Sequence, residues 1–120
     1  MNRTLIFVIL YTALLALAIA FPVFAFDNIT PLDVKQKLDA KEDVFILDVR
    51  QPEEYAQGYI PKAYLIPLGE LDQRLNEVPK DKYLIVVCQS GGRSDKASQM
   101  LDDNGYKKVS FLSSINVERK

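Results

Sequence analysis

The sequence predicts an α/β fold: a small single domain with a mostly parallel central sheet flanked by helices. Two observations lead to this prediction. Short runs such as 44–47 and 83–87 are almost continuously apolar, as expected of strands covered on both faces of a parallel sheet. Segments with helical signals alternate with these runs along the chain. A length of 120 residues corresponds to one domain, which we assign to residues 26–120.

Residues 1–25 have the three-part pattern of a secretory signal peptide. Arg3 gives a positive start, and an uncharged, mostly apolar run follows and ends at Pro22. Val23 and Ala25 then offer small or medium-sized side chains at the −3 and −1 positions of a cleavage site. We therefore predict cleavage after Ala25 and an exported, periplasmic protein.

The alternative for this segment is an uncleaved membrane anchor. Residues 4–26 carry no charge, and as a helix they would span ~35 Å, longer than the ~30 Å apolar core of a bilayer. Both interpretations place the domain outside the cytoplasm, and contact with a membrane is expected only if the segment stays uncleaved. A lone cysteine suits that compartment if it is reactive rather than structural.

The first expected element of the domain is a helix that begins near residue 31. Thr30 is a suitable N-cap, Pro31 fits the first helical position, and Asp33 places negative charge in the first turn. The residues expected on its inward face are Leu32, Val34 and Leu38.

Further helical segments alternate with four expected strands. Pro52 and Gly58 bound a short helix. A helix over 93–104 is expected to end at Gly105. This helix should bury Ala97, Met100 and Leu101. In an earlier segment, four apolar residues recur at helical spacing: Leu68, Leu71, Leu75 and Val78. The strands are expected at 44–47, 63–66, 83–87 and 109–112.

Composition excludes several classes of site. The formal net charge is −1, from 15 basic and 16 acidic residues, so no basic surplus points to nucleic acid. With one cysteine there is no internal disulfide and no zinc site made of cysteines alone. With no histidine there is no Cys–His pair, no Ser–His–Asp triad and no histidine metal ligand. We therefore expect neither a metal nor a cofactor.

The most informative segment follows the apolar run 83–87 and contains the only cysteine, Cys88. A strand, a glycine-containing loop and an amphipathic helix form a turn whose backbone N–H groups can point at one sulfur atom, aided by the helix dipole. These groups and the charge of Arg93 favour the thiolate, the reactive form of cysteine. The expected site comprises the catalytic Cys88 and the loop residues Gln89, Ser90, Gly91, Gly92, Arg93 and Ser94.

Other polar residues are expected to have structural roles. Asp48 and Arg50 follow the run 44–47 and are expected to form hydrogen bonds or a salt bridge that holds the loops. Ser90 and Ser94 are expected either to donate hydrogen bonds to the sulfur or to cap the helix, and capping is favoured for Ser94. Tyr59 is expected to pack, and Glu53 and Glu54 are expected on a solvated helix face.

Four further segments, before and after the Cys88 loop, support the interpretation of that loop. They are residues 47–55, 58–63, 66–71 and 105–106. Together with the loop, where four residues separate Cys88 from Arg93, they resemble the rhodanese family of sulfurtransferases. The segments lie in the family's order, and the resemblance covers most of residues 28–118.

The resemblance implies sulfur transfer through a persulfide. Cys88 would take a sulfane sulfur from thiosulfate or a persulfide donor and pass it to cyanide or a thiol acceptor. Gly91 and Gly92 would let backbone N–H groups approach the sulfur closely. Arg93 would bind an anionic donor by a two-point contact, with a structural arginine as the alternative.

The sequence departs from the family pattern at several positions. Tyr59 stands in place of the usual histidine and Lys62 in place of a glycine. Near the end, Ser113 and Ser114 replace a Gly-Gly pair and Glu118 replaces a tryptophan. Because a positive φ is costly without glycine, we expect an altered C-terminal segment.

Two other functions stay open. Cys-dependent phosphatases and arsenate reductases also place Cys and Arg around an oxyanion, but their loop is longer, and the shorter loop here is better matched to one sulfur. The third interpretation is a non-catalytic rhodanese-like module that binds a partner. The presence of Cys88 and Arg93 disfavours it, and the altered C-terminus favours it.

Overall fold

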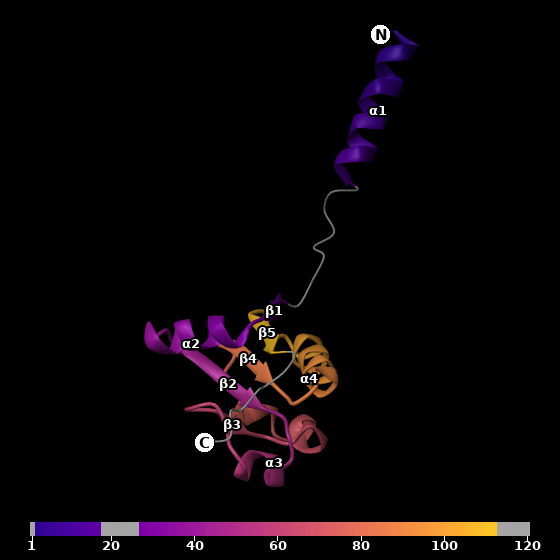
Figure 1. The fold of residues 1–120 in the computed structure, drawn as a ribbon. Helices are drawn as coiled ribbons and strands as arrows, with labels where there is room; N and C mark the ends of the chain where they lie inside the picture. The colour runs from indigo at the N-terminus through magenta and orange to yellow at the C-terminus, as the bar shows by residue number, and fades with distance from the viewer. Residues whose placement is uncertain (1, 18–26, 113–120) are drawn as a thin grey trace.

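The computed structural model describes residues 2–17 and 27–112 (Figure 1). In chain order, the helices and strands are α1 (Arg3–Leu17), β1 (Asp27–Ile29), α2 (Pro31–Asp39), β2 (Val44–Asp48), α3 (Pro52–Ala56), β3 (Tyr64–Leu65), β4 (Tyr83–Val87), α4 (Gly92–Asp103) and β5 (Val109–Leu112). Between β3 and β4 lie two 3-10 turns, η1 (Leu68–Gln73) and η2 (Leu75–Glu77).

The described strands form one five-stranded sheet in the order β1-β5-β4-β2-β3, and every pair of neighbours is parallel. The predicted fold class, a small α/β domain with a parallel sheet flanked by helices, is confirmed. The sequence analysis predicted four strands and missed β1. That strand has three residues, and only Ile29 of these is buried, so no apolar run marked it.

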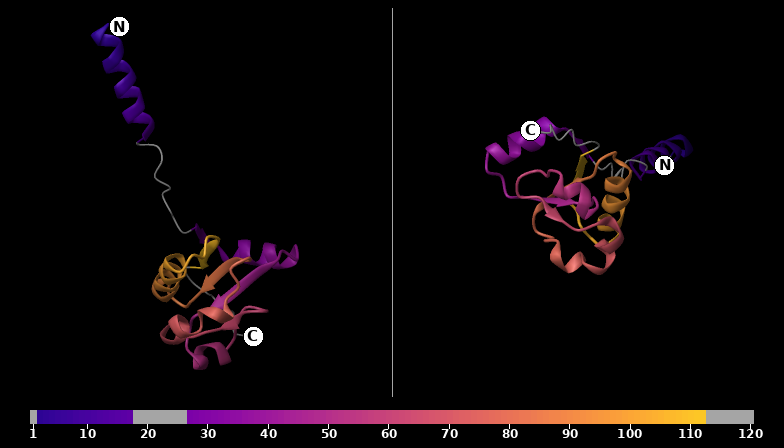
Figure 2. Two further views of the ribbon diagram at one scale, coloured as in Figure 1. Left: turned by 180° about the vertical axis from the view of Figure 1, so that it is seen from behind. Right: turned by 60° about the horizontal axis from the view of Figure 1, so that its bottom comes forward.

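Each face of the sheet carries its own apolar core, with α2 and α4 on opposite sides (Figures 1 and 2). Side chains of β4 alternate between them: Leu84 and Val86 pack on the α4 side, and Ile85 and Val87 on the α2 side. Coverage on both faces explains why this run has no polar position. β4 is therefore the rigid central strand from which the Cys88 loop emerges.

Helix α2 begins at the predicted cap. The Thr30 hydroxyl accepts the Asp33 N–H at 3.2 Å, and the Asp33 carboxylate accepts the Thr30 N–H at 3.0 Å. The expected inward face was wrong in one position, because Val34 is buried whereas Leu32 is 62% exposed. Val34 and Leu38 are four residues apart and share a face, but a helix turns Leu32 to the other side.

The segment after β3 is less regular than its spacing suggested. Leu71 and Val78 are buried, as the helical spacing indicated, but they lie in and after 3-10 turns rather than on one α-helix. Helix α4 agrees better with its prediction. It buries Ala97 and Leu101, whereas Met100, also expected to be buried, is only partly so. Gly105 ends the helix with a φ of +86°.

Several sequence predictions fall outside the described residues: Pro22, residues 23–25, Ser113, Ser114 and Glu118. The side chains over residues 2–12, in α1, are exposed. In the described ranges, no helix combines the length and the apolarity that crossing a membrane requires.

Candidate active site

The site lies at the carboxyl edge of the sheet, where three strands end together. Cys88 directly follows β4, whose last residue, Val87, pairs with Asp48 of β2 and Leu112 of β5. The loops after β2 and β4 therefore meet at one edge, which is where open α/β sheets bind ligands.

The loop after Cys88 turns its backbone toward the sulfur. Gly91 has a φ of +87°, a conformation that favours glycine, and its N–H donates to the Cys88 Sγ at 3.0 Å. Gly92 is different, because a Cβ added there would meet no atom within 4 Å. Of the two glycines predicted to allow close approach, only Gly91 is required by the backbone.

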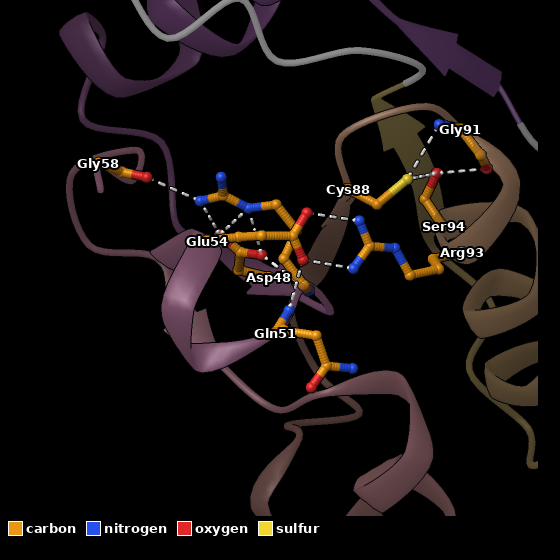
Figure 3. A network of polar contacts seen from close by, with 9 residues as sticks. Asp48, Gln51, Glu54, Gly58, Cys88, Gly91, Arg93 and Ser94 are labelled. Carbon is orange, nitrogen blue, oxygen red and sulfur yellow. Dashed lines mark hydrogen bonds and ion pairs between the residues drawn. The ribbon is translucent and has the colours of Figure 1, made fainter. Parts of the chain in front are cut away.

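Ser94 completes the surroundings of the sulfur (Figure 3). Its side chain is buried, and its hydroxyl accepts the Cys88 S–H at 3.3 Å and donates to the Gly91 carbonyl at 2.9 Å. The predicted role as the helix cap was wrong, because the N-cap of α4 is Gly91 and Ser94 lies within the first turn. Ser94 instead forms a hydrogen bond with the sulfur, the other predicted role, and links the sulfur to the loop.

These contacts make Cys88 a stronger acid than an ordinary cysteine. Burial raises the pKa of the Cys88 thiol, because it disfavours the charged form. Hydrogen bonds to the sulfur from the Ser94 hydroxyl and from the backbone N–H groups of Ser94, Ser90 and Gly91 outweigh burial and lower the pKa below its ordinary value. The side chains of Gln89 and Ser90 are exposed at the loop tip.

Arg93 is committed to a partner that the sequence analysis did not assign to the site. Its Nη1 and Nη2 atoms donate to the two carboxylate oxygens of Glu54, at 2.6 and 2.7 Å (Figure 3). The expected position of Glu54 on a solvated helix face was wrong, since its side chain is 28% exposed in this ion pair. The two-point contact expected between Arg93 and a donor is made with Glu54 instead.

Glu54 also belongs to α3, which follows β2. Its carboxylate accepts the Gln51 N–H at 2.8 Å, so the side chain is held from two sides. The hydrogen bonds with Arg93, followed by that with Gln51, lower the pKa of Glu54 to about 2. The spacing of Gln51 and Glu54 is that of a capping box, a sequence signal that could have fixed the direction of this side chain.

Asp48 and Arg50 form the ion pair that their positions suggested. Both side chains are buried, and the Arg50 Nη2 lies 2.8 Å from the Asp48 carboxylate and donates to the Gly58 carbonyl at 2.8 Å. The Arg50 N–H also donates to Asp48, at 3.0 Å. The pair thus ties the end of β2 to the loop that follows α3.

Two departures from the family pattern lie on the same loop. Tyr59 packs, as expected, by stacking on Tyr55 with ring centroids 4.1 Å apart, although it stays 52% exposed. Lys62 has a φ of +68°, the left-handed conformation that a glycine would adopt without cost. The loop keeps its glycine-type turn without the glycine.

The described part of the chain therefore brings together a low-pKa thiol, a set of N–H donors aimed at it, and a neighbouring Arg–Glu pair. None of these groups is arranged to hold a metal, and no cluster of three metal-type ligands occurs among the described residues. The arrangement stabilises negative charge on one sulfur atom.

Comparison with known proteins agrees with this geometry. The family model "Rhodanese-like domain" matches residues 30–114. A sulfurtransferase of Allochromatium vinosum is 41% identical over 76 residues, which are 63% of this chain and 71% of that protein. YrkF of Bacillus subtilis is 44% identical over 75 residues, 62% of this chain but only 40% of YrkF. The structure of a rhodanese-like domain protein from Staphylococcus aureus matches with a TM-score of 0.65 at 37% identity, over 74% of this chain and 84% of that one.

Proposed function

Because the chain belongs to the rhodanese-like domain family, we propose that it is a single-domain sulfurtransferase that carries sulfur on Cys88. The observation that carries this proposal is the contact between the Gly91 N–H and the Cys88 Sγ at 3.0 Å, in a loop whose amides lower the pKa of that thiol. In a persulfide the negative charge lies on the outer sulfur, one S–S bond beyond the Cys88 Sγ, and the N–H groups and helix N-terminus of the same loop would stabilise it there.

With thiosulfate as donor, the first half-reaction is a displacement at sulfur. The Cys88 thiolate attacks the outer, sulfane sulfur, a new S–S bond forms, and the original S–S bond breaks with its electron pair leaving on sulfite. One thiolate and one dianion become a persulfide anion and a sulfite dianion, so charge and atoms balance without another reactant.

The second half-reaction returns the thiolate. Cyanide attacks the outer sulfur of the persulfide, forms thiocyanate, and leaves the electron pair on Cys88. A thiol acceptor, reacting as its thiolate, would take the sulfur in the same way and become a persulfide. Thiosulfate or a persulfide donor, with cyanide or a thiol acceptor, are the substrates that we propose.

Mass spectrometry of the purified protein tests the covalent step. Incubation with thiosulfate should add ~32 Da, one sulfur atom, and cyanide should remove it with release of thiocyanate. The Cys88→Ser variant should show neither adduct nor turnover. Full thiocyanate formation by Cys88→Ser, or no adduct on the wild-type protein with any sulfane donor, would overturn the proposal.

The two alternatives are separated by the same preparation. Phosphatase or arsenate reductase chemistry needs the arginine fork for an oxyanion, but Arg93 holds Glu54 with both Nη atoms. Hydrolysis of p-nitrophenyl phosphate at a rate above that of sulfur transfer would favour that class. A binding module would give neither reaction while keeping its fold.

We also propose that the domain is exported and that the N-terminal segment is cleaved after Ala25. The support is the sequence pattern: Arg3, the apolar run that follows, and the small or medium-sized Val23 and Ala25 at the −3 and −1 positions. N-terminal sequencing of the exported form should begin at Phe26. Recovery of the full-length chain in the membrane fraction would make the uncleaved anchor correct.

A further inference from the structure

Arg93 is the cation that an anionic donor would need, and Glu54 already forms an ion pair with it. Glu54 comes from α3, which follows β2, and Arg93 from the first turn of α4, so the pair bridges the two segments that border Cys88 (Figure 3). Both Nη atoms of Arg93 point at the carboxylate. Their side chains are 29% and 28% exposed, so the pair is partly shielded from water.

Arg93 lies close enough to the sulfur to matter for its charge. Hydrogen bonding to Glu54 is the main reason that the pKa of Arg93 is raised, and the charges of Cys88 and Asp48 add to the rise. The arginine is therefore shared between the thiolate and the carboxylate. The positive charge of Arg93 that the Glu54 carboxylate neutralises is not available to a bound anion.

The charges at this edge of the sheet do not favour a second anion. Asp48 and Arg50 neutralise each other as a buried pair, and Glu54 and Arg93 do the same above them. With Cys88 as a thiolate, one negative charge is left without a counter-charge of its own. A dianionic donor is repelled twice as strongly as a monoanion by that remaining charge.

We propose that Glu54 sets the charge preference of the sulfur donor, favouring sulfane donors of low negative charge over dianions such as thiosulfate. This inference rests on the proposed sulfur transfer. Glu54 does not touch the reacting sulfur; it acts by neutralising Arg93. Because its carboxylate stays ionised at all ordinary pH values, with a pKa of about 2, the preference holds across the working range.

The Glu54→Gln variant isolates this charge. Glutamine keeps one oxygen, which can accept the Gln51 N–H and the Arg93 Nη1 as the Glu54 Oε2 does, but it loses the second acceptor and leaves the arginine charge free. Two donors with the same leaving chemistry are compared: thiosulfate, a dianion that releases sulfite, and methanethiosulfonate, a monoanion that releases methanesulfinate. Each gives the same Cys88 persulfide, and because each donor is compared with itself between the wild-type protein and the variant, the difference between the leaving groups cancels.

The expected result is a selective gain in kcat/KM. Since the Coulomb energy scales with donor charge, a gain of about threefold with methanethiosulfonate should accompany a gain of about tenfold with thiosulfate. Glu53→Gln is the matched control: it removes the same charge from the neighbouring, exposed position and should change neither value by more than about twofold.

Two outcomes would overturn the inference. One is an equal change with both donors in Glu54→Gln, which would mean that Glu54 only holds the loop. The other is the same selective gain in Glu53→Gln, which would assign the effect to net surface charge. Failure of the proposed function is distinct, because the wild-type protein would then form no persulfide with either donor.

Discussion

Replacing Ser94 by alanine should make Cys88 a weaker acid. The Ser94 hydroxyl lies 3.3 Å from the sulfur in a fully buried position, so its loss removes a hydrogen bond to the thiolate that water cannot readily replace. A hydrogen bond to a charged group contributes about 1.5–3 kcal/mol. The lower value applies here, because the hydroxyl proton is bound to the Gly91 carbonyl while sulfur is protonated. At a fixed pH below the pKa, the ratio of thiolate to thiol should fall about tenfold.

The geometry allows the hydroxyl to turn to the thiolate without leaving a buried acceptor empty. The Gly91 carbonyl also accepts the Asp95 N–H, at 2.9 Å. When Cys88 ionises, the hydroxyl proton moves from the Gly91 carbonyl to the sulfur, and the carbonyl keeps the Asp95 N–H. The Ser94→Ala variant should therefore fold normally while it loses acidity at Cys88.

The assay is the pH dependence of alkylation by iodoacetamide, which reports a single site because Cys88 is the only cysteine. Ser98→Ala is the matched control. Ser98 is also buried on α4, and its hydroxyl has no hydrogen-bond partner in the part of the chain that the structure describes. Its replacement should leave the alkylation midpoint where it is in the wild-type protein.

The result that refutes the reasoning is a Ser94→Ala midpoint that coincides with those of the wild-type protein and Ser98→Ala. The backbone N–H groups alone would then account for the acidity of Cys88. A midpoint that moves equally in both variants would point to a general loosening of α4.

Three further substitutions test the framework around the site by equilibrium unfolding in urea. Arg50→Met should cost about 3–5 kcal/mol, because it leaves the buried Asp48 charge without its partner; a loss below about 1 kcal/mol would contradict this. Lys62→Gly should stabilise the domain by about 1 kcal/mol, since it relieves a φ of +68°, and destabilisation would show that the lysine side chain matters more. Tyr106→Phe should cost about 0.5–1.5 kcal/mol, because its hydroxyl donates to the Val78 carbonyl at 2.9 Å; an unchanged stability would remove that contribution.

The elements with strong local signals were predictable from the sequence. The cap at Thr30, the continuous apolar run of β4 and the stop at Gly105 each have a local physical cause, and the structure has them where the sequence placed them. The short strand β1 had no such signal. Its pairing with β5 comes from a segment more than eighty residues away, as the register Asp27 to Ser110 shows.

The site was predictable at the sulfur and less so around it. Cys88 and its loop follow from a strand, a glycine and a helix in sequence, and Asp48 and Arg50 from their place at the end of a strand. The partner of Arg93 was missed because Glu54 lies 39 positions away, on a helix that looked solvated. Charged side chains pair according to where loops meet, which a local pattern does not encode.

Because Cys88 is completely buried, the pKa of its thiol does not by itself determine the rate at which the sulfur reacts. The residue has no exposed surface, so a donor, an acceptor or an oxidant reaches the sulfur only while a local fluctuation opens its surroundings. The observed rate is then the intrinsic reactivity multiplied by the open fraction. A sulfur stored on Cys88 between the two halves of the reaction would be protected by the same closure. The lifetime of the stored sulfur would therefore depend on how often the site opens, independently of the hydrogen bonds that lower the pKa of the thiol.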